Sequence, residues 1–264
     1  MQHTISISQD DLVKHLKLSC QIPQIIEGIV AHKIIMAIAE AEEIAAEPEE
    51  LQEAADSLRL TNNLRQVDET LAWLRHHHLT IEEFETISRT SVITTKLAKH
   101  LLETQIEPFF WEHRLEYIKA VIYELILEDE DLVQELYYSL QEGEASFSEI
   151  ARQYIQEPEK RRLGGFRGIV SRQELRPEIA AAVFAASPPQ LIAPITSPLG
   201  THLILVEEII QPILDKEMRD RILSHLFTEW LKGKIKQAEV TINLSGKSYL
   251  PQQSISTVTI EASM

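Results

Sequence analysis

Glycine and proline are distributed very unevenly along this chain. Of its eight glycines only Gly28 precedes Gly143, and eight of its eleven prolines lie at or after Pro158. Both residues interrupt regular structure, because glycine loses the most conformational freedom on folding and proline lacks an amide hydrogen. A first half that nearly lacks them favours long helices, and a second half that contains most of them favours short strands and turns. We therefore predict an α+β chain with a helical N-terminal part.

The apolar pattern of residues 1–118 agrees with this helical prediction. Apolar side chains recur at helical spacing, for example at Leu12, Leu16 and Cys20. Pro48 is followed at once by acidic residues, which is typical of a helix N-terminus. Thr80 precedes a glutamate at the spacing of a capping box. These patterns predict a module of five or six helices over residues 1–118.

The C-terminal part contains one further amphipathic helix. It runs over residues 215–238, and its apolar face consists of Ile222, Leu223, Leu226, Trp230, Leu231 and Ile235. We expect this helix, within a segment of residues 211–240, to pack on the N-terminal module, because no strand face is left for it to cover. Residues 241–264 are rich in Ser, Thr and Gln and predict a loose tail or one edge strand.

The segment of residues 119–210 alternates between strand and helix patterns. Its predicted order is β-α-α-β-α-β-β, inserted in sequence between the helical segments. The patterns that carry the prediction are an apolar strand at 117–127, helices at 131–140 and 146–154, and strands at 169–170, 194–196 and 201–206. The third helix lies between the second and third strands, where Leu175 and Ile179 have a four-residue spacing.

Charge and cysteine content exclude several classes of function. The formal net charge of −16 disfavours nucleic acid, whose phosphates require a basic face. Cys20 is the single cysteine, so no intramolecular disulfide forms and a reducing compartment is favoured. The N-terminus has no pattern of a secretory signal, and no run approaches the ~18 apolar residues of a membrane helix. We expect a cytoplasmic protein without membrane insertion, unless a signal has been removed, and we predict no metal site and no cofactor.

Three motifs follow one another between Gly143 and Val206. They are Ala-Ser-Phe-Ser-Glu-Ile-Ala at 145–151, Gly-Gly-Phe-Arg-Gly at 164–168, and Pro-Ile-Thr-Ser-Pro-Leu-Gly-Thr-His-Leu-Ile-Leu-Val at 194–206. Over about residues 121–208 this order resembles the parvulin-type peptidyl-prolyl isomerases, and the flanking helical segments resemble those of SurA- and PrsA-type chaperone-foldases. The resemblance implies an enzyme that isomerises X-Pro bonds, whose rotation faces a barrier of roughly 18–20 kcal/mol.

The resemblance also implies a set of site residues. His202 matches the last histidine of the family, Glu124 occupies the position of its first histidine, and Glu157 matches an acid or cysteine before the Gly-Gly turn. These three are the implied catalytic residues. The implied substrate-binding residues are the proline-pocket positions Leu175, Ile179 and Phe184, together with Leu199, which stands three residues before the histidine, and Arg167.

Two interpretations of this site stay open. Glu124 can pair with His202 as carboxylate and imidazole, which preserves one donor–acceptor contact of an isomerase. If that contact is lost, the segment is a degenerate chaperone or peptide-binding module that holds a client for an export or maturation system. Either activity implies unfolded or precursor polypeptides that contain proline as partners. A basic cluster either attracts acidic client segments or is a solvated loop; it comprises Lys160, Arg161, Arg162, Arg167, Arg172 and Arg176.

Overall fold

The computed structural model describes residues 5–242 and divides into two compact units. The first joins Met1–Ile106 to the chain from Arg219 onward, and the second is Glu107–Met218. The sequence analysis placed its boundaries at 118/119 and 210/211 instead. The limits of the units fall inside two long helices, α5 and α10, which continue past them. Most of the tail predicted over residues 241–264 lies outside the described residues.

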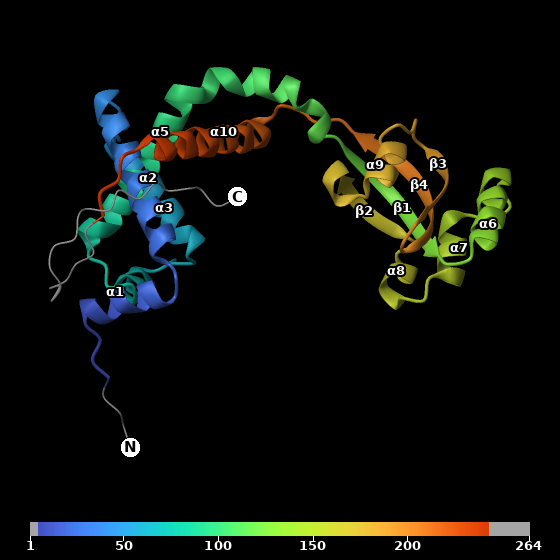
Figure 1. Ribbon diagram of the computed structural model, residues 1–264, viewed down its shortest axis with the longest axis horizontal. Helices are drawn as coiled ribbons and strands as arrows, with labels where there is room; N and C mark the ends of the chain where they lie inside the picture. Colours follow the sequence, from blue (N-terminus) through green and yellow to red (C-terminus); the bar gives the residue numbers. More distant parts are fainter. Residues whose placement is uncertain (1–4, 243–264) are drawn as a thin grey trace. The chain divides into compact units, whose positions relative to one another are not determined.

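Helices make up the first unit (Figure 1). They are α1 (Gln9–Leu18), α2 (Ile22–Ala41), α3 (Pro48–Thr61), α4 (Val67–His76), α5 (Ile81–Glu112) and α10 (Lys216–Gln237). The predicted capping box at Thr80 is present: the Thr80 amide donates to Glu83 Oε2 at 2.8 Å, and the Glu83 amide donates to Thr80 Oγ1 at 3.1 Å. Helix α10 buries Ile222, Leu223, Phe227 and Ile235.

Helix α2 corrects the expectation that no segment is apolar enough to cross a membrane. By length and hydropathy it is the one such helix among the described residues, although it contains charged residues such as Glu27 and Lys33. Only 17% of its most apolar window is buried. Core helices of soluble proteins and signal sequences pass the same test, so the finding describes the helix and does not assign it to a membrane.

The second unit is built on a four-stranded antiparallel sheet in the order β2-β1-β4-β3. Its elements are η1 (Arg114–Glu116), β1 (Lys119–Leu127), α6 (Glu130–Glu142), α7 (Phe147–Tyr154), α8 (Pro158–Arg162), β2 (Phe166–Ser171), η2 (Arg172–Glu174), α9 (Pro177–Val183), β3 (Gln190–Ser197) and β4 (Gly200–Ile210). This is the predicted order, with the short helices η1, α8 and η2 in addition. The α+β class predicted from sequence, with a strand-containing domain inserted between helical segments, is confirmed.

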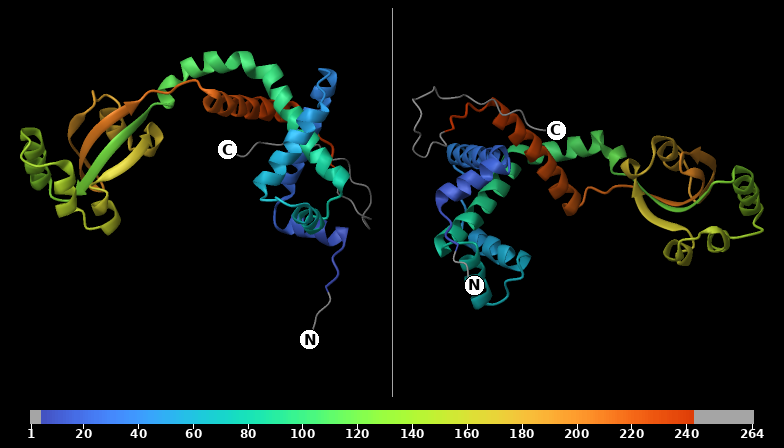
Figure 2. Two further views of the ribbon diagram at one scale, coloured as in Figure 1. Left: turned by 180° about the vertical axis from the view of Figure 1, so that it is seen from behind. Right: turned by 60° about the horizontal axis from the view of Figure 1, so that its bottom comes forward.

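Helices cover both faces of this sheet (Figure 2). Alternate residues of a strand point to opposite faces. Ile122 of β1 and Ile204 of β4 therefore pack with α9 in one core cluster. Leu125 and Leu203 pack with α6 and α7 in another. Every second residue of β1 counted from Ile122, and of β4 counted from Ile204, faces the side of the sheet that α9 covers.

Gly165 positions the central strand from the turn before β2. It has φ +82°, and its carbonyl accepts a hydrogen bond of 2.8 Å from the Glu124 amide. A Cβ at this position would lie 2.8 Å from Phe147 Cε1 and 3.2 Å from Ala151 Cβ. Only glycine accommodates both the left-handed backbone and the close contact.

We expect Gly165→Ala to lower the free energy of unfolding of the second unit by about 2–4 kcal/mol, the sum of backbone strain and overpacking. Hydrogen exchange of the β4 amides in the full chain measures this loss. Gly168→Ala is the matched control, because Gly168 has φ +99° and a Cβ there meets nothing within 4 Å. Equal losses in the two variants would show that the contact with Phe147 costs nothing.

Candidate functional site

The site lies on the two central strands, where β1 and β4 pair. Ile126 is directly opposite His202 in this ladder. Glu124 and Ile126 lie two and four residues after Ile122 on β1, and His202 lies two residues before Ile204 on β4. Their side chains therefore point to the same face of the sheet as Ile122 and Ile204, the face that α9 covers. Helix α9 covers the hydrophobic part of that face, and the site begins where this cover ends. Two residues distant in sequence are thus brought together by strand register.

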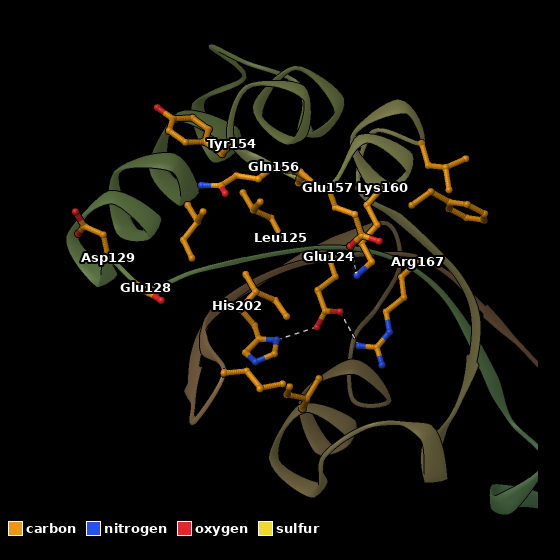
Figure 3. Close-up of a pocket in the computed structure, with 18 of the residues that line it drawn as sticks. Glu124, Leu125, Glu128, Asp129, Tyr154, Gln156, Glu157, Lys160, Arg167 and His202 are labelled. Atoms are coloured by element: carbon orange, nitrogen blue, oxygen red, sulfur yellow. Dashed lines mark hydrogen bonds and ion pairs between the residues drawn. The ribbon is translucent and has the colours of Figure 1, made fainter.

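Four side chains form a continuous hydrogen-bonded network at this position (Figure 3). Arg167 Nη1 donates to Glu124 Oε2 at 2.6 Å. His202 Nδ1 lies 2.8 Å from Glu124 Oε1, and His202 Nε2 lies 2.7 Å from Ser197 Oγ. The side chains of Glu124 and His202 are only 9% and 3% exposed. The contact between these two residues is the one that the first interpretation of the sequence requires.

The hydroxyl of Ser197 holds the second nitrogen of the His202 ring. Ser197 Oγ accepts the Leu199 amide at 3.1 Å, so its own proton is available to His202 Nε2. The imidazole then carries its proton on Nδ1, which faces the carboxylate of Glu124. Both ring nitrogens of His202 are thus hydrogen-bonded, Nδ1 with Glu124 and Nε2 with Ser197, which fixes the orientation of the ring.

The Glu124 carboxyl is ionised in this arrangement. Burial raises its pKa, but the hydrogen bond from His202 and the positive charge of Arg167 lower it by more, so the pKa lies below its ordinary value. A carboxylate held between a guanidinium and an imidazole N–H is the stable form of this network at neutral pH.

A cavity of about 1120 Å³ opens beside the network. Glu124, Arg167 and His202 lie in its wall, and apolar side chains beside them include Ile179 and Leu199. Strand β1, helix α8 and the segment around Tyr154 supply most of the remaining lining. In Figure 3, Glu128 and Asp129 lie to the left of His202, and Glu157 and Lys160 lie above Glu124 and Arg167.

The three implied catalytic residues do not all join the network. Glu124 and His202 do. Glu157 lies in the cavity wall at the N-cap of α8, is 54% exposed and pairs with Lys160 at 2.7 Å. Its carboxylate is part of a solvated ion pair, because α8 begins there and directs the side chain to the surface.

The prediction of an apolar wall made by Leu175, Ile179 and Phe184 is wrong in part. Leu175 and Phe184 do not line the cavity among the described residues; they belong to the core between α9 and the sheet. Phe184 is in addition covered by the guanidinium of Arg172, 4.7 Å from its ring centroid. Ile179 lines the cavity but is only 2% exposed, since it is also a core residue.

Sequence reasoning missed Ser197 and assigned its place to Leu199. The hydroxyl that contacts His202 comes from five residues upstream, because β3 and β4 form a tight hairpin in which Ser197 pairs with Gly200. Leu199 lies in that turn, 63% exposed, and lines the cavity. The Ser-Pro-Leu-Gly sequence before His202 is a hairpin signal that would have placed Ser197 beside the ring.

Arg167 has a different position from the one that the basic cluster suggested. Its guanidinium is held by Glu124 and by the backbone carbonyl of Glu174 at 3.3 Å. Of the six basic residues of the cluster, only Lys160, Arg167 and Arg176 line the cavity. No group of three or more His, Cys, Asp or Glu side chains in the described part of the chain is placed to hold a metal ion.

Residues 127–208, which run from the last residue of β1 into β4 and include His202, match the model of the Rotamase family, described as the PPIC-type PPIase domain. This match identifies the segment as a parvulin-type peptidyl-prolyl isomerase domain, and the chain around it is similar in sequence to PrsA foldases and SurA chaperones. The matched range begins at Leu127, so Glu124 precedes it.

Relatives match a larger part of the chain. The foldase protein PrsA of Halalkalibacterium halodurans is 25% identical over 233 residues, which cover 83% of this chain and 68% of that protein. The chaperone SurA of Alkalilimnicola ehrlichii is 28% identical over 130 residues, covering 45% of this chain and 30% of its own length. Among solved structures, the peptidylprolyl isomerase PrsA of Bacillus cereus has a TM-score of 0.44 at 19% identity and covers 86% of this chain and 82% of that one.

Proposed function

We propose that the cavity beside His202 isomerises X-Pro bonds in unfolded or precursor polypeptides. The observation that carries the proposal is the buried contact between Glu124 and His202 at the edge of this cavity, within a PpiC-type domain. Similar proteins are named foldase and chaperone, which supports unfolded polypeptides as clients. Delivery of clients to an export or maturation system belongs to the same proposal. So does a cytoplasmic location, which the single cysteine favours.

The mechanism that we propose is desolvation and shape selection. The prolyl ring is seated against Leu199, beside the network, where water is displaced from the X-Pro amide. Binding the twisted amide more tightly than either planar isomer lowers the rotational barrier, and about 4 kcal/mol of such preference gives roughly a thousandfold. The network of Arg167, Glu124, His202 and Ser197 holds the wall of the cavity in one conformation.

The serine, histidine and glutamate of this network have the hydrogen-bond order of a hydrolase triad, but their placement does not support acyl transfer. Ser197 is not among the described residues that line the cavity, and its oxygen is held between the Leu199 amide and His202 Nε2. A nucleophile must meet its substrate in the cavity. The serine instead orients the imidazole.

The proposal is tested by NMR exchange or a protease-coupled assay on a series of X-Pro peptides, in which the wild-type chain should accelerate isomerisation. His202→Ala should lower kcat/KM by about tenfold, less than the 10²–10⁴-fold typical of a lost general base, because no proton moves in the reaction. The rate should have no bell-shaped dependence on pH between about 6 and 9.

Two results would contradict this account. If wild type binds the peptides but does not accelerate their isomerisation, the site is a peptide-binding module. If a folded His202→Ala variant loses activity on the scale of a general base, proton transfer takes part in the reaction and the shape-based mechanism is wrong.

A further inference from the structure

The cavity carries an excess of negative charge at its wall. Its carboxylates are Glu124, Glu128, Asp129, Glu157 and Glu174, and its basic side chains are Lys160, Arg167 and Arg176. Two of the cations are neutralised inside the wall, because Arg167 pairs with Glu124 at 2.6 Å and Lys160 pairs with Glu157 at 2.7 Å. The charges of the other three carboxylates, Glu128, Asp129 and Glu174, are then balanced only by Arg176 among the basic side chains of the wall. The clients that this wall favours are therefore basic, the opposite of what the basic cluster in the sequence suggested.

Glu128 is the carboxylate best placed to act on a client. Asp129 accepts the Leu132 amide as the N-cap of α6, and Glu174 accepts the amide and hydroxyl of Ser171. Glu128 is exposed, lines the cavity and makes no hydrogen bond or ion pair with any other residue in the described part of the chain. Its full charge is available to a bound peptide.

The register of the sheet places Glu128 within reach of the residues next to a bound proline. Ile126 is directly opposite His202, and Glu128 follows two residues later, just after the last residue of β1. Two residues along an extended strand span about 7 Å. A peptide whose proline lies beside His202 advances by a similar amount over two residues, so a side chain flanking the proline can approach Glu128. Figure 3 shows Glu128 on the side of His202 away from Arg167.

We infer that Glu128 is a specificity-determining residue that makes the cavity select X-Pro sites flanked by lysine or arginine. This inference rests on the proposed function and adds to it the class of client sequence. An exposed carboxylate contributes a modest, salt-dependent preference rather than an absolute requirement.

The test uses the full chain and two series of short peptides. One carries Lys, Gln or Glu directly before the proline, and the other carries the same residues directly after it. In at least one series, kcat/KM of the wild type should fall in the order Lys, Gln, Glu, with a two- to fivefold step at low salt, the size of an exposed ion pair. Raising the ionic strength to about 1 M should remove the steps.

Variants attribute the preference to one side chain. Glu128→Gln should abolish the difference between Lys and Glu peptides, and Glu128→Lys should reverse it. Glu135→Gln is the matched control, since Glu135 is an exposed glutamate of α6 that does not line the cavity and carries the same charge. It should leave the preference intact.

Each outcome of these assays either supports or contradicts the assigned role of Glu128. Equal rates on all peptides, a preference for Glu peptides in both series, or a Lys preference that survives Glu128→Gln would overturn it. If wild type isomerises no peptide at all, the proposed function fails, and the charge preference is then measured separately as the Kd of fluorescently labelled Lys, Gln and Glu peptides. Kd values in the order Lys, Gln, Glu that become equal in Glu128→Gln would support it.

Discussion

Glu124→Ala is expected to lower the free energy of unfolding of the second unit by about 3 kcal/mol, the cost of removing one partner from a buried charge pair. Glu124 is 9% exposed and is bonded to both His202 and Arg167, so its loss leaves a buried imidazole N–H and a guanidinium without their acceptor. Hydrogen exchange of the β1 and β4 amides measures the change. Peptide isomerisation should fall at the same time, because the cavity wall loses its order.

A matched control for this variant lies in the same cavity. Glu157→Ala removes a carboxylate of the same kind that is 54% exposed and paired only with an exposed lysine. Its expected cost is below about 1 kcal/mol. If Glu157→Ala costs as much as Glu124→Ala, burial of the network contributes nothing to stability.

The contribution of Glu124 also has a defined dependence on pH. Its pKa in the folded state is below the ordinary value, so the carboxylate stabilises the fold fully above the unfolded-state pKa of about 4.3, and this stabilisation is lost as the pH falls through the folded value. The difference in unfolding free energy between wild type and Glu124→Gln should therefore be constant at neutral pH and shrink below about pH 4. A difference that persists in acid would show that the loss is steric.

The position of Arg167 changes the effect that we expect the Glu124→His substitution to have on the isomerisation rate. The sequence analysis treated Glu124 as a replacement for a family histidine, which suggests that Glu124→His preserves activity. The guanidinium of Arg167 lies 2.6 Å from the carboxylate, so an imidazole placed there faces a cation without a counter-charge. We expect Glu124→His alone to lower the isomerisation rate and Glu124→His with Arg167→Met to restore it. The double variant tests whether the two residues act as a unit.

Ile179→Asp is expected to unfold the second unit, at a cost of at least about 4 kcal/mol. Ile179 is 2% exposed and packs in the core with Val183 and Ile204, so a carboxylate there would be buried without a partner. Loss of protection of all four strands in hydrogen exchange would demonstrate the effect. A partly exposed pocket wall, as inferred from sequence, would instead tolerate the change.

The variant Leu199→Asp tests the role of the cavity in peptide binding without disturbing the core. Leu199 is 63% exposed and lines the same cavity, so this variant should keep its stability within about 0.5 kcal/mol and lose affinity for Pro-containing peptides. Unchanged affinity would show that the proline does not sit against this turn.

The sequence predicted elements better than it predicted side-chain partners. The strands and helices of the second unit follow from apolar periodicity and from glycines that local backbone geometry requires, so their order could be read directly. The contact between Glu124 and His202 was a prediction because both residues fall on positions of one known network. Arg167 could not be assigned to it, since its ion pair depends on how the turn at Gly165 directs β2 beside β1.

The spacing of apolar residues in the sequence could not show which side chains are buried in the core and which line the cavity. Leu175 and Ile179 share a helical spacing, which places them on one face but does not say whether a cavity or a core lies beneath that face. The same ambiguity applies to the basic cluster. Its cations look alike in sequence, yet the structure neutralises Lys160 and Arg167 with neighbouring carboxylates and stacks Arg172 on Phe184.

The first unit is discontinuous in the chain, and this has a consequence for the order in which the protein is made. Synthesis proceeds from the N-terminus, so the whole sheet of the second unit, up to the end of β4, leaves the ribosome before helix α10 does. The first unit lacks the buried side chains of Ile222, Phe227 and Ile235 until that moment. We expect the second unit to fold first on the nascent chain. The helices of the first unit, although synthesised earlier, keep an apolar surface exposed until α10 packs on them.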